Sequence, residues 1–184
     1  MRREDIEFEI ATKVCIFNHE GAPGLGVDAN DQAFSVGGKK YELKQFRFHR
    51  PSEEKINGKS FDMTLHIVHA DEAGKLTVVA VLPQQGKENP FIRELWNDLP
   101  TENEKEELLD QMQIDVSQLL PANRSYYTFS GSLTTPPCSE DVTRFVLKHP
   151  TTVSAKEIER FSRLYRNDAR PTQPLHDRVA LESQ

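Results

Sequence analysis

Two histidines with strand-like spacing are the residues of this sequence best suited to chemistry. His49 closes the run YELKQFRFH and His66 lies within FDMTLHIVH, and both runs have the composition of strands. Alternate side chains of a strand point to the same face, so neighbouring strands would bring the two imidazoles together. Two histidines meeting on a sheet make up most of a catalytic zinc site, which usually takes three protein ligands and a water. Arg47 stands where the third ligand could stand.

Arg47 does not fit such a site. It precedes His49 by two positions, so the first strand carries R-x-H where a zinc-binding strand would carry H-x-H. An arginine stays protonated and has no lone pair to offer a metal, and its charge repels a divalent cation. Spacing alone therefore leaves two interpretations of His49 and His66 open, a pair of metal ligands or a pair of structural residues.

Other polar residues could complete or replace a metal site. Gln45 shares the face of Arg47 and could hydrogen-bond a neighbouring ring. Glu53 follows the first strand and is a partner for Arg47, a partner for a distant hydroxyl, or a solvated loop carboxylate. The run LTTPP places two threonine hydroxyls beside a rigid proline pair, which suits the orientation of a small ligand as well as it suits a plain turn.

Composition and length predict one domain over residues 1–184. The chain has 36% hydrophobic and 28% charged residues, which is ordinary for a globular protein with a sizeable core. Its net charge of −6 disfavours nucleic acid as a partner, and no window has the roughly 18 apolar residues of a membrane span. The opening MRREDIEFEI lacks the apolar stretch of a secretory signal, so a cytoplasmic location is expected, or a periplasmic or secreted one if the natural start lies upstream.

The remaining pattern is that of a sheet with short helices around it, an α+β fold. The run LTVVAVL has the apolar character of a central strand covered on both faces. Capping boxes formed by Thr101 with Glu104 and by Ser154 with Glu157 predict the starts of two helices, and the Gly- and Pro-rich run NHEGAPGLG predicts a loop. Strands are expected within 6–17 and over 33–36, 41–49, 61–69, 76–82, 126–131 and 142–148, and a further helix over 89–100.

Together these segments resemble the α-class carbonic anhydrases, especially the bacterial branch, from about residue 27 to the C-terminus. QFRFH resembles the family's first ligand strand, which normally reads QFHFH. FDMTLHIVHAD resembles its third-ligand strand, GKENPFIRELWNDLP its helix and YYTFSGSLTTPPCSE its substrate loop. The resemblance implies a mainly antiparallel central sheet with short surrounding helices, and a zinc enzyme that hydrates carbon dioxide. The family's N-terminal portion has no counterpart in this sequence.

The resemblance also implies roles for single residues. His49 and His66 match the second and third zinc ligands, and Arg47 takes the place of the first. Thr134 matches the gatekeeping threonine that accepts a hydrogen bond from zinc-bound hydroxide, and Glu53 matches the carboxylate that orients it. Positions behind the first and third ligands are held by Gln45 and Thr64, and positions of the substrate cavity by Val68, Val78, Leu133, Thr135, Pro137 and Arg144.

Several positions depart from the family pattern. Thr64 stands where the active family has a glutamate, and Arg144 where the cavity wall has a tryptophan. His19 is a nearby candidate for the family's proton-shuttle histidine, or an exposed loop residue. Cys138 matches one half of the bacterial disulfide, but Cys15 does not match the other half, so Cys138 is expected to be free or to bond outside this segment.

These departures leave two functions to weigh. The first is a carbonic-anhydrase-like protein with a degraded zinc site, catalytically silent or strongly impaired, that binds a small anion between arginines or binds another protein. The second is a working carbonic anhydrase that binds carbon dioxide and bicarbonate and holds zinc through His49, His66 and a substitute ligand such as Glu53. Sheet surface that the family's N-terminal portion normally covers should be exposed here, which predicts a homodimer or a strand-exchanged assembly.

Overall fold

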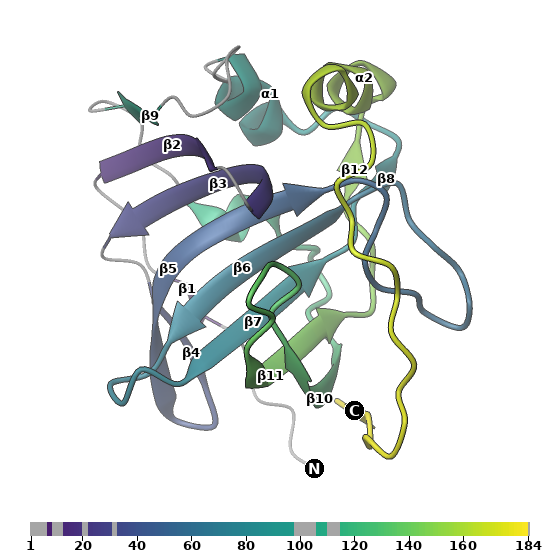
Figure 1. The fold of residues 1–184 in the computed structure, drawn as a ribbon. Coiled ribbons are helices and arrows are strands. Elements are labelled where there is room, and N and C mark those ends of the chain that lie inside the picture. The colour runs from purple at the N-terminus through teal and green to yellow at the C-terminus, as the bar shows by residue number, and fades with distance from the viewer. Residues whose placement is uncertain are drawn as a thin grey trace.

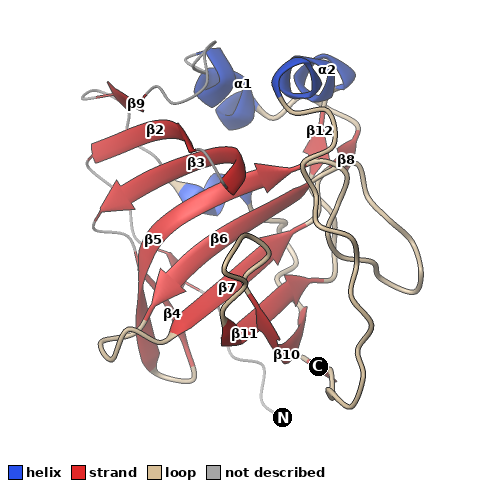
Figure 2. Ribbon diagram, in the orientation of Figure 1, coloured by secondary structure: helices blue, strands red, loops and turns tan. Residues whose placement is uncertain are grey.

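The computed structural model describes residues 33–97 and 115–183 with their side chains, and the backbone of four further strands outside those ranges. Within this described part, eleven strands form one large curled sheet (Figures 1 and 2). Its strands are β1 (Glu7–Phe8), β2 (Lys13–His19), β3 (Ala22–Asn30), β4 (Ala33–Val36), β5 (Lys39–His49), β6 (Thr64–Ala70), β7 (Leu76–Val81), β9 (Glu106–Leu109), β10 (Tyr126–Ser132), β11 (Glu140–Leu147) and β13 (Leu181–Glu182). Across the sheet they follow the order β13-β10-β11-β7-β6-β5-β3-β2-β9, and β4 lies beside β5 and β1.

The sheet is almost entirely antiparallel. Among the strand pairs described in it, β7 and β11 form the one parallel pair. Two short strands, β8 (Gln84–Gln85) and β12 (Thr152–Val153), form a separate parallel pair. The predicted α+β fold, with a mainly antiparallel sheet and short helices around it, is therefore confirmed.

Two short helices, α1 (Pro90–Asn97) and α2 (Ala155–Leu164), lie together at one side of the sheet, at the top of Figure 1. The predicted capping box starts α2, because the Ser154 hydroxyl accepts from the Glu157 N–H and the Glu157 carboxylate accepts from the Ser154 N–H. A 3₁₀ helix, η1 (Val116–Leu119), precedes β10. Each helix in the described residues is too short or too polar to cross a membrane.

An aromatic cluster joins β5 to these helices. Phe46 and Phe48 are fully buried on the face of β5 that points away from the histidines. The Phe48 ring lies edge-on to Trp96 of α1, with ring centroids 5.6 Å apart, and Trp96 stacks on Phe161 of α2 at 5.5 Å. Burial of aromatic side chains contributes strongly to stability. The alternation of β5 therefore divides its residues between a packed core and the opposite face, where the site lies.

Two predictions about local structure are wrong. The helix expected after Thr101 is replaced at Glu106–Leu109 by strand β9, which pairs with β2, and the rest of that segment lies outside the described residues. The loop expected over 18–26 is largely strand, because β3 pairs with β2 on one side and with β5 on the other. In both cases pairing with other strands supplies backbone hydrogen bonds that local propensity does not foresee.

His69 lies on the core side of β6, as its position in the alternating pattern predicts. It is fully buried, its ring meets Phe34 edge-on with centroids 4.4 Å apart, and its Nδ1 lies 3.2 Å from the carbonyl oxygen of Ile67. Burial lowers the pKa of His69 from 6.5 to about 3, although the Ile67 carbonyl opposes this shift. The residue is therefore neutral in the folded protein at any moderate pH and takes no part in the site.

His69 should make the protein lose stability in mild acid. The unfolded chain takes up a proton near pH 6.5, whereas the folded protein resists protonation down to about pH 3. Between these values the unfolded state binds more protons, so the free energy of unfolding falls as pH falls, by about 1.4 kcal/mol per pH unit for this one group. Denaturant melts from pH 7 to pH 4 should show a flatter slope for His69→Gln than for the wild type. Equal slopes would contradict this account.

Candidate metal centre

The register between β5 and β6 brings the predicted histidines together. Arg47 pairs with His66 and His49 pairs with Thr64 across the two strands. The rings of His49 and His66 have centroids 5.4 Å apart, and the two residues are 1% and 4% exposed. The expectation that these side chains share one sheet face is confirmed.

Glu53 joins the two histidines in a buried cluster. One ring nitrogen of His49, one of His66 and a carboxylate oxygen of Glu53 all lie within 4.8 Å of one another. Glu53 Oε2 lies 3.5 Å from His66 Nδ1, while Oε1 accepts a 2.6 Å hydrogen bond from the backbone N–H of Arg170. Within the described part of the chain, His49 Nε2 and Glu53 Oε2 have no hydrogen-bond partner. Buried polar atoms are rarely left unpaired, which makes the cluster suitable for a ligand.

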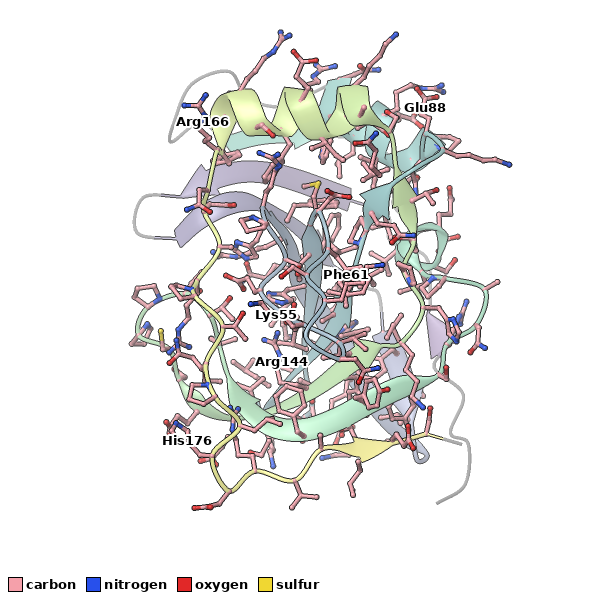
Figure 3. The ribbon with its side chains drawn as sticks, turned by 90° about the vertical axis from the view of Figure 1, so that its right-hand side faces the viewer. Lys55, Phe61, Glu88, Arg144, Arg166 and His176 are labelled. Carbon is pink, nitrogen blue, oxygen red and sulfur yellow. The ribbon has the colours of Figure 1, made fainter. Side chains whose placement is uncertain are left out.

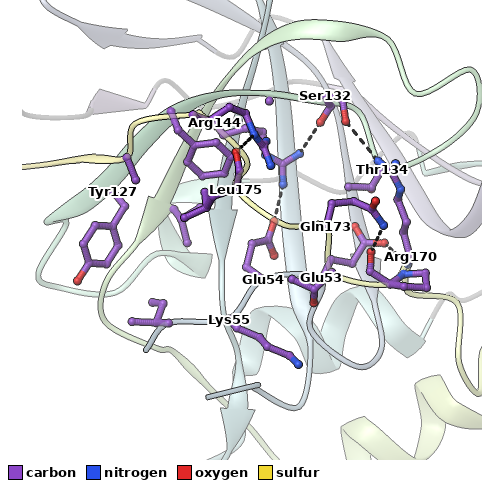
Figure 4. A pocket seen from close by; sticks show the side chains of 18 of the residues that line it. Glu53, Glu54, Lys55, Tyr127, Ser132, Thr134, Arg144, Arg170, Gln173 and Leu175 are labelled. Carbon is purple, nitrogen blue, oxygen red and sulfur yellow. Dashed lines mark hydrogen bonds and ion pairs between the residues drawn. The ribbon is translucent and has the colours of Figure 1, made fainter. Parts of the chain in front are cut away.

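Behind His66 stands a second carboxylate, Glu54. Its Oε1 lies 2.6 Å from His66 Nε2, and its Oε2 accepts a 2.9 Å hydrogen bond from the Thr64 hydroxyl. The Arg144 guanidinium also donates to Oε1, and its Nη2 lies 2.8 Å from His66 Nε2. Figure 4 shows the contact between Arg144 and Glu54 at close range.

The charges in this group set the protonation states. Burial opposes ionisation of Glu54, but His66, Arg144 and the Thr64 hydroxyl together hold the pKa of its carboxyl well below the usual range. Burial, and to a smaller extent the Arg144 charge, lowers the pKa of His66, although Glu54 acts in the opposite direction. An ionised Glu54 and a neutral His66 imidazole follow at neutral pH.

His49 has its own carboxylate neighbour. Asp168 Oδ2 lies 3.5 Å from His49 Nδ1, and both side chains are almost completely buried. Its other oxygen accepts a 2.7 Å hydrogen bond from the Arg50 N–H, which fixes the Asp168 segment against the end of β5. Each histidine therefore has one carboxylate on its outer side, and Glu53 lies between them.

Arg47 lies beside this cluster, on the same strand face. Its Nε donates a 2.5 Å hydrogen bond to Gln45 Oε1, so Gln45 contacts the arginine rather than a histidine ring. The Arg47 side chain lines a small cavity together with both histidines. The residue that replaces a family ligand thus remains at the site.

The cavity has a volume of about 120 Å³ and collects most of the predicted site residues. Leu76 and Lys44 also line it, and neither was predicted. Pro137 is exposed and does not line it, which corrects the prediction that it forms part of the apolar wall. Thr64, which was predicted behind the third ligand, is buried and does not line the cavity either. The predicted residues that line it are Gln45, Arg47, His49, His66, Val68, Val78, Leu133, Thr134, Thr135 and Arg144.

A larger cavity of about 370 Å³ adjoins the first, because Thr134 and Arg144 line both. It lies between the loop that carries Glu53, strand β10 and the C-terminal segment. Lys55 and Arg144 of its lining are labelled in Figure 3, and in Figure 4 the Glu54 carboxylate points toward Arg144. Glu53 and Glu54 line this larger cavity and not the smaller one. The cluster therefore borders both cavities, because its histidines line the smaller one and Glu53 lines the larger one.

Besides Leu76 and Lys44, sequence reasoning missed three residues that contact the cluster. Glu54 directly follows the predicted Glu53, so the pair of adjacent carboxylates after a ligand strand was an available signal. Asp168 and Arg170 act from a segment more than a hundred positions away, and no local pattern marks them. His19 lies on β2, but its side chain is outside the described residues, as is that of Cys15. Cys138 forms no disulfide with any described residue.

The donor set fits a divalent metal ion in part. Two imidazoles and a carboxylate are a known ligand set of catalytic zinc, and the separation of His66 Nδ1 from Glu53 Oε2 is near that of two ligands on one ion. The charge of Arg47 on the same face opposes a cation. The arrangement can therefore hold a metal, with lower affinity than three histidines would give.

Comparisons with known proteins point to one protein family. The family model described as eukaryotic-type carbonic anhydrase matches residues 12–184. A carbonic anhydrase of Klebsiella pneumoniae is 44% identical over 149 residues, which are 80% of this chain and 60% of that protein. The chain thus spans less than two thirds of the length of that relative.

Two solved structures have the same fold. A hyperthermostable carbonic anhydrase from a hydrothermal vent chimney superposes with a TM-score of 0.91 and 38% identity, over 100% of this chain and 82% of the other. The α-carbonic anhydrase of Thermovibrio ammonificans, solved with the inhibitor sulfanilamide, gives a TM-score of 0.90 and 37% identity, over 98% and 79%.

Proposed function

Because this chain belongs to the eukaryotic-type carbonic anhydrase family, we propose that it binds a small anion of the bicarbonate class and hydrates carbon dioxide only weakly or not at all. The observation that carries this proposal is the place of Arg47, opposite His66 in the strand register and on the wall of the smaller cavity. At the position where the family has its first zinc ligand, this chain has the permanently charged side chain of Arg47.

The lining of the smaller cavity supports anion binding. Arg47, Arg144 and Lys44 line it, Arg144 being paired with Glu54, and there is no carboxylate among the described residues of the lining itself. A guanidinium presents paired N–H donors that match the oxygens of a planar anion. The small volume of the cavity, about 120 Å³, favours a small anion over a large one. Its lining also includes the apolar side chains of Val68, Val78, Leu76 and Leu133.

Weak hydration follows from the same substitution. Zinc lowers the pKa of a bound water towards neutrality, and carbonic anhydrase is itself the standard example of this effect. That chemistry needs a metal held firmly by three ligands, and Arg47 has no lone pair to contribute. Its charge also disfavours the divalent ion. The lost ligand and the added positive charge both weaken zinc binding, and both therefore lower the rate of hydration.

Metal binding by a different ligand set is a second candidate function. The unpaired buried atoms of His49 and Glu53, with His66 Nδ1 beside them, favour it. A zinc ion bound there would supply a water of lowered pKa. Around it, the Thr134 hydroxyl is placed to orient a small ligand, and Leu133 narrows the cavity against bulk water. Hydration by such a centre is expected to be far slower than by the three-histidine centre of the family.

Bicarbonate binding tests the proposal directly. Titration of the metal-free protein with ¹³C-bicarbonate, followed by NMR, should show saturable binding. Arg47→Gln should weaken this binding about tenfold or more, because a charged hydrogen bond contributes about 1.5–3 kcal/mol. Arg163→Gln serves as the control, since Arg163 lies on the exposed side of α2, paired with Glu159. Equal affinity in the wild type and Arg47→Gln, or no binding to the wild type, would exclude this function.

A further inference from the structure

We propose that Glu54 is a positioning residue that fixes the tautomer of His66. Its carboxylate holds the proton on Nε2, so that the unprotonated Nδ1 points to Glu53 at the centre of the cluster. The inference rests on the second candidate function, metal binding, because that is the function which this tautomer would serve. Its central claim, the position of the His66 proton, concerns the metal-free protein.

Hydrogen-bond chemistry requires this tautomer. Both oxygens of Glu54 accept hydrogen bonds, Oε1 from the Arg144 guanidinium and Oε2 from the Thr64 hydroxyl. The charged guanidinium and the hydroxyl favour the ionised carboxylate, which only accepts hydrogen bonds. The 2.6 Å contact between Oε1 and His66 Nε2 therefore needs a hydrogen on Nε2. A neutral imidazole carries one N–H, so Nδ1 keeps its lone pair.

Arg144 makes the role of Glu54 decisive. Its Nη2 lies 2.8 Å from the same His66 nitrogen, and a guanidinium is always a donor. Without the Glu54 carboxylate, Arg144 would donate to Nε2 and the imidazole proton would move to Nδ1. In that tautomer His66 presents an N–H to the centre and cannot bind a metal through Nδ1. Glu54 and Arg144 therefore favour opposite tautomers, and the carboxylate prevails in the present arrangement.

The loop that carries Glu54 is held to β6 by Thr64. The Glu53 N–H donates to the Thr64 hydroxyl at 3.0 Å, and that hydroxyl donates to Glu54 Oε2 at 2.9 Å. Thr64 is fully buried, and the Glu54 side chain is 11% exposed. Residues 53 and 54 are thus fixed on both sides of the imidazole.

Two departures from the family pattern meet at this point. Thr64 stands where the resemblance places a glutamate, and Arg144 where it places a tryptophan, and both donate to Glu54. The carboxylate that the strand lacks is supplied from the loop instead. The two substitutions therefore belong to one relocated network rather than to two separate losses.

The tautomer can be read from ¹⁵N NMR of the metal-free protein. In the wild type, His66 should carry its proton on Nε2. In Glu54→Ala the proton should move to Nδ1, and the affinity for Co²⁺ should fall about 10–100-fold, the range for partners of metal-bound histidines. Glu72→Ala, which removes an exposed carboxylate, should change neither quantity.

A rescue variant separates positioning from general stability. Glu54→Ala combined with Thr64→Glu returns a carboxylate to the strand, and recovery of the Nε2–H tautomer would support the proposal. A wild-type His66 protonated on Nδ1 would overturn it, whether or not any variant folds. An unchanged tautomer in Glu54→Ala would overturn it as well. Failure of bicarbonate binding would refute the proposed function and leave this result standing, since the tautomer is measured without either ligand.

Discussion

Arg47→His is expected to raise the affinity for zinc at least about 100-fold. The new imidazole would stand opposite His66 in the register and on the same face as His49, where it completes a three-histidine set. The substitution also removes a positive charge from the cavity wall. Partners that only orient a ligand change zinc affinity about 10–100-fold, in carbonic anhydrases among other zinc proteins, so a direct ligand should exceed that range. Competition with a chromophoric chelator measures the change.

Arg47→Gln is the matched control for this experiment. It removes the charge and keeps a side chain of similar length, but it offers no imidazole. Its zinc affinity should rise only by the part that the lost charge contributes, and should stay well below that of Arg47→His. If the two variants gained affinity equally, charge rather than the missing ligand would explain the weak site, and the assignment of Arg47 to a ligand position would be wrong.

Phe48→Ala is expected to lower the free energy of unfolding by about 3–5 kcal/mol. Phe48 is fully buried and contacts Trp96 of α1 and Phe161 of α2, with ring centroids 5.6 and 6.4 Å away. Its truncation leaves a cavity between the sheet and both helices that neighbouring rings cannot fill without moving. Urea unfolding followed by tryptophan fluorescence measures the loss, since Trp96 reports on this region.

The control lies on the same strand. Lys44 is exposed, so Lys44→Ala should change the free energy of unfolding by no more than about 0.5 kcal/mol. A loss below about 1 kcal/mol for Phe48→Ala would contradict the view that this face of β5 anchors the strand. The position of Arg47 and His49 depends on that anchor, because they occupy the opposite face of the strand.

The sequence alone was enough to predict strands β5 and β6, which carry the site, and the face on which each of their residues lies. Alternation in β5 and β6 placed Arg47, His49 and His66 on one face, because a period of two decides the face of each residue before any tertiary contact is known. The family resemblance then supplied most of the cavity wall, although it wrongly included Pro137 and missed Leu76 and Lys44. Long motifs on regular elements were therefore predictable.

Partners contributed from distant segments were not predictable. Asp168 contacts His49, and the Arg170 N–H donates to Glu53. These residues come together only when the chain folds, so no local sequence pattern marks them. Strand pairing, which local propensity does not encode, explains β3 and β9, where it overrides a Gly- and Pro-rich run and a capping-box pattern. The expected homodimer and the expected cellular location stay predictions.

The rate of carbon dioxide hydration with zinc in saturating excess tests the central claim most directly. Stopped-flow measurement on the wild type and on Arg47→His, at equal zinc occupancy, separates weak metal binding from weak catalysis. We predict a wild-type rate at least about 100-fold below that of Arg47→His, which corresponds to about 2.7 kcal/mol of barrier. A wild-type rate equal to that of Arg47→His would contradict the claim that Arg47 impairs the reaction.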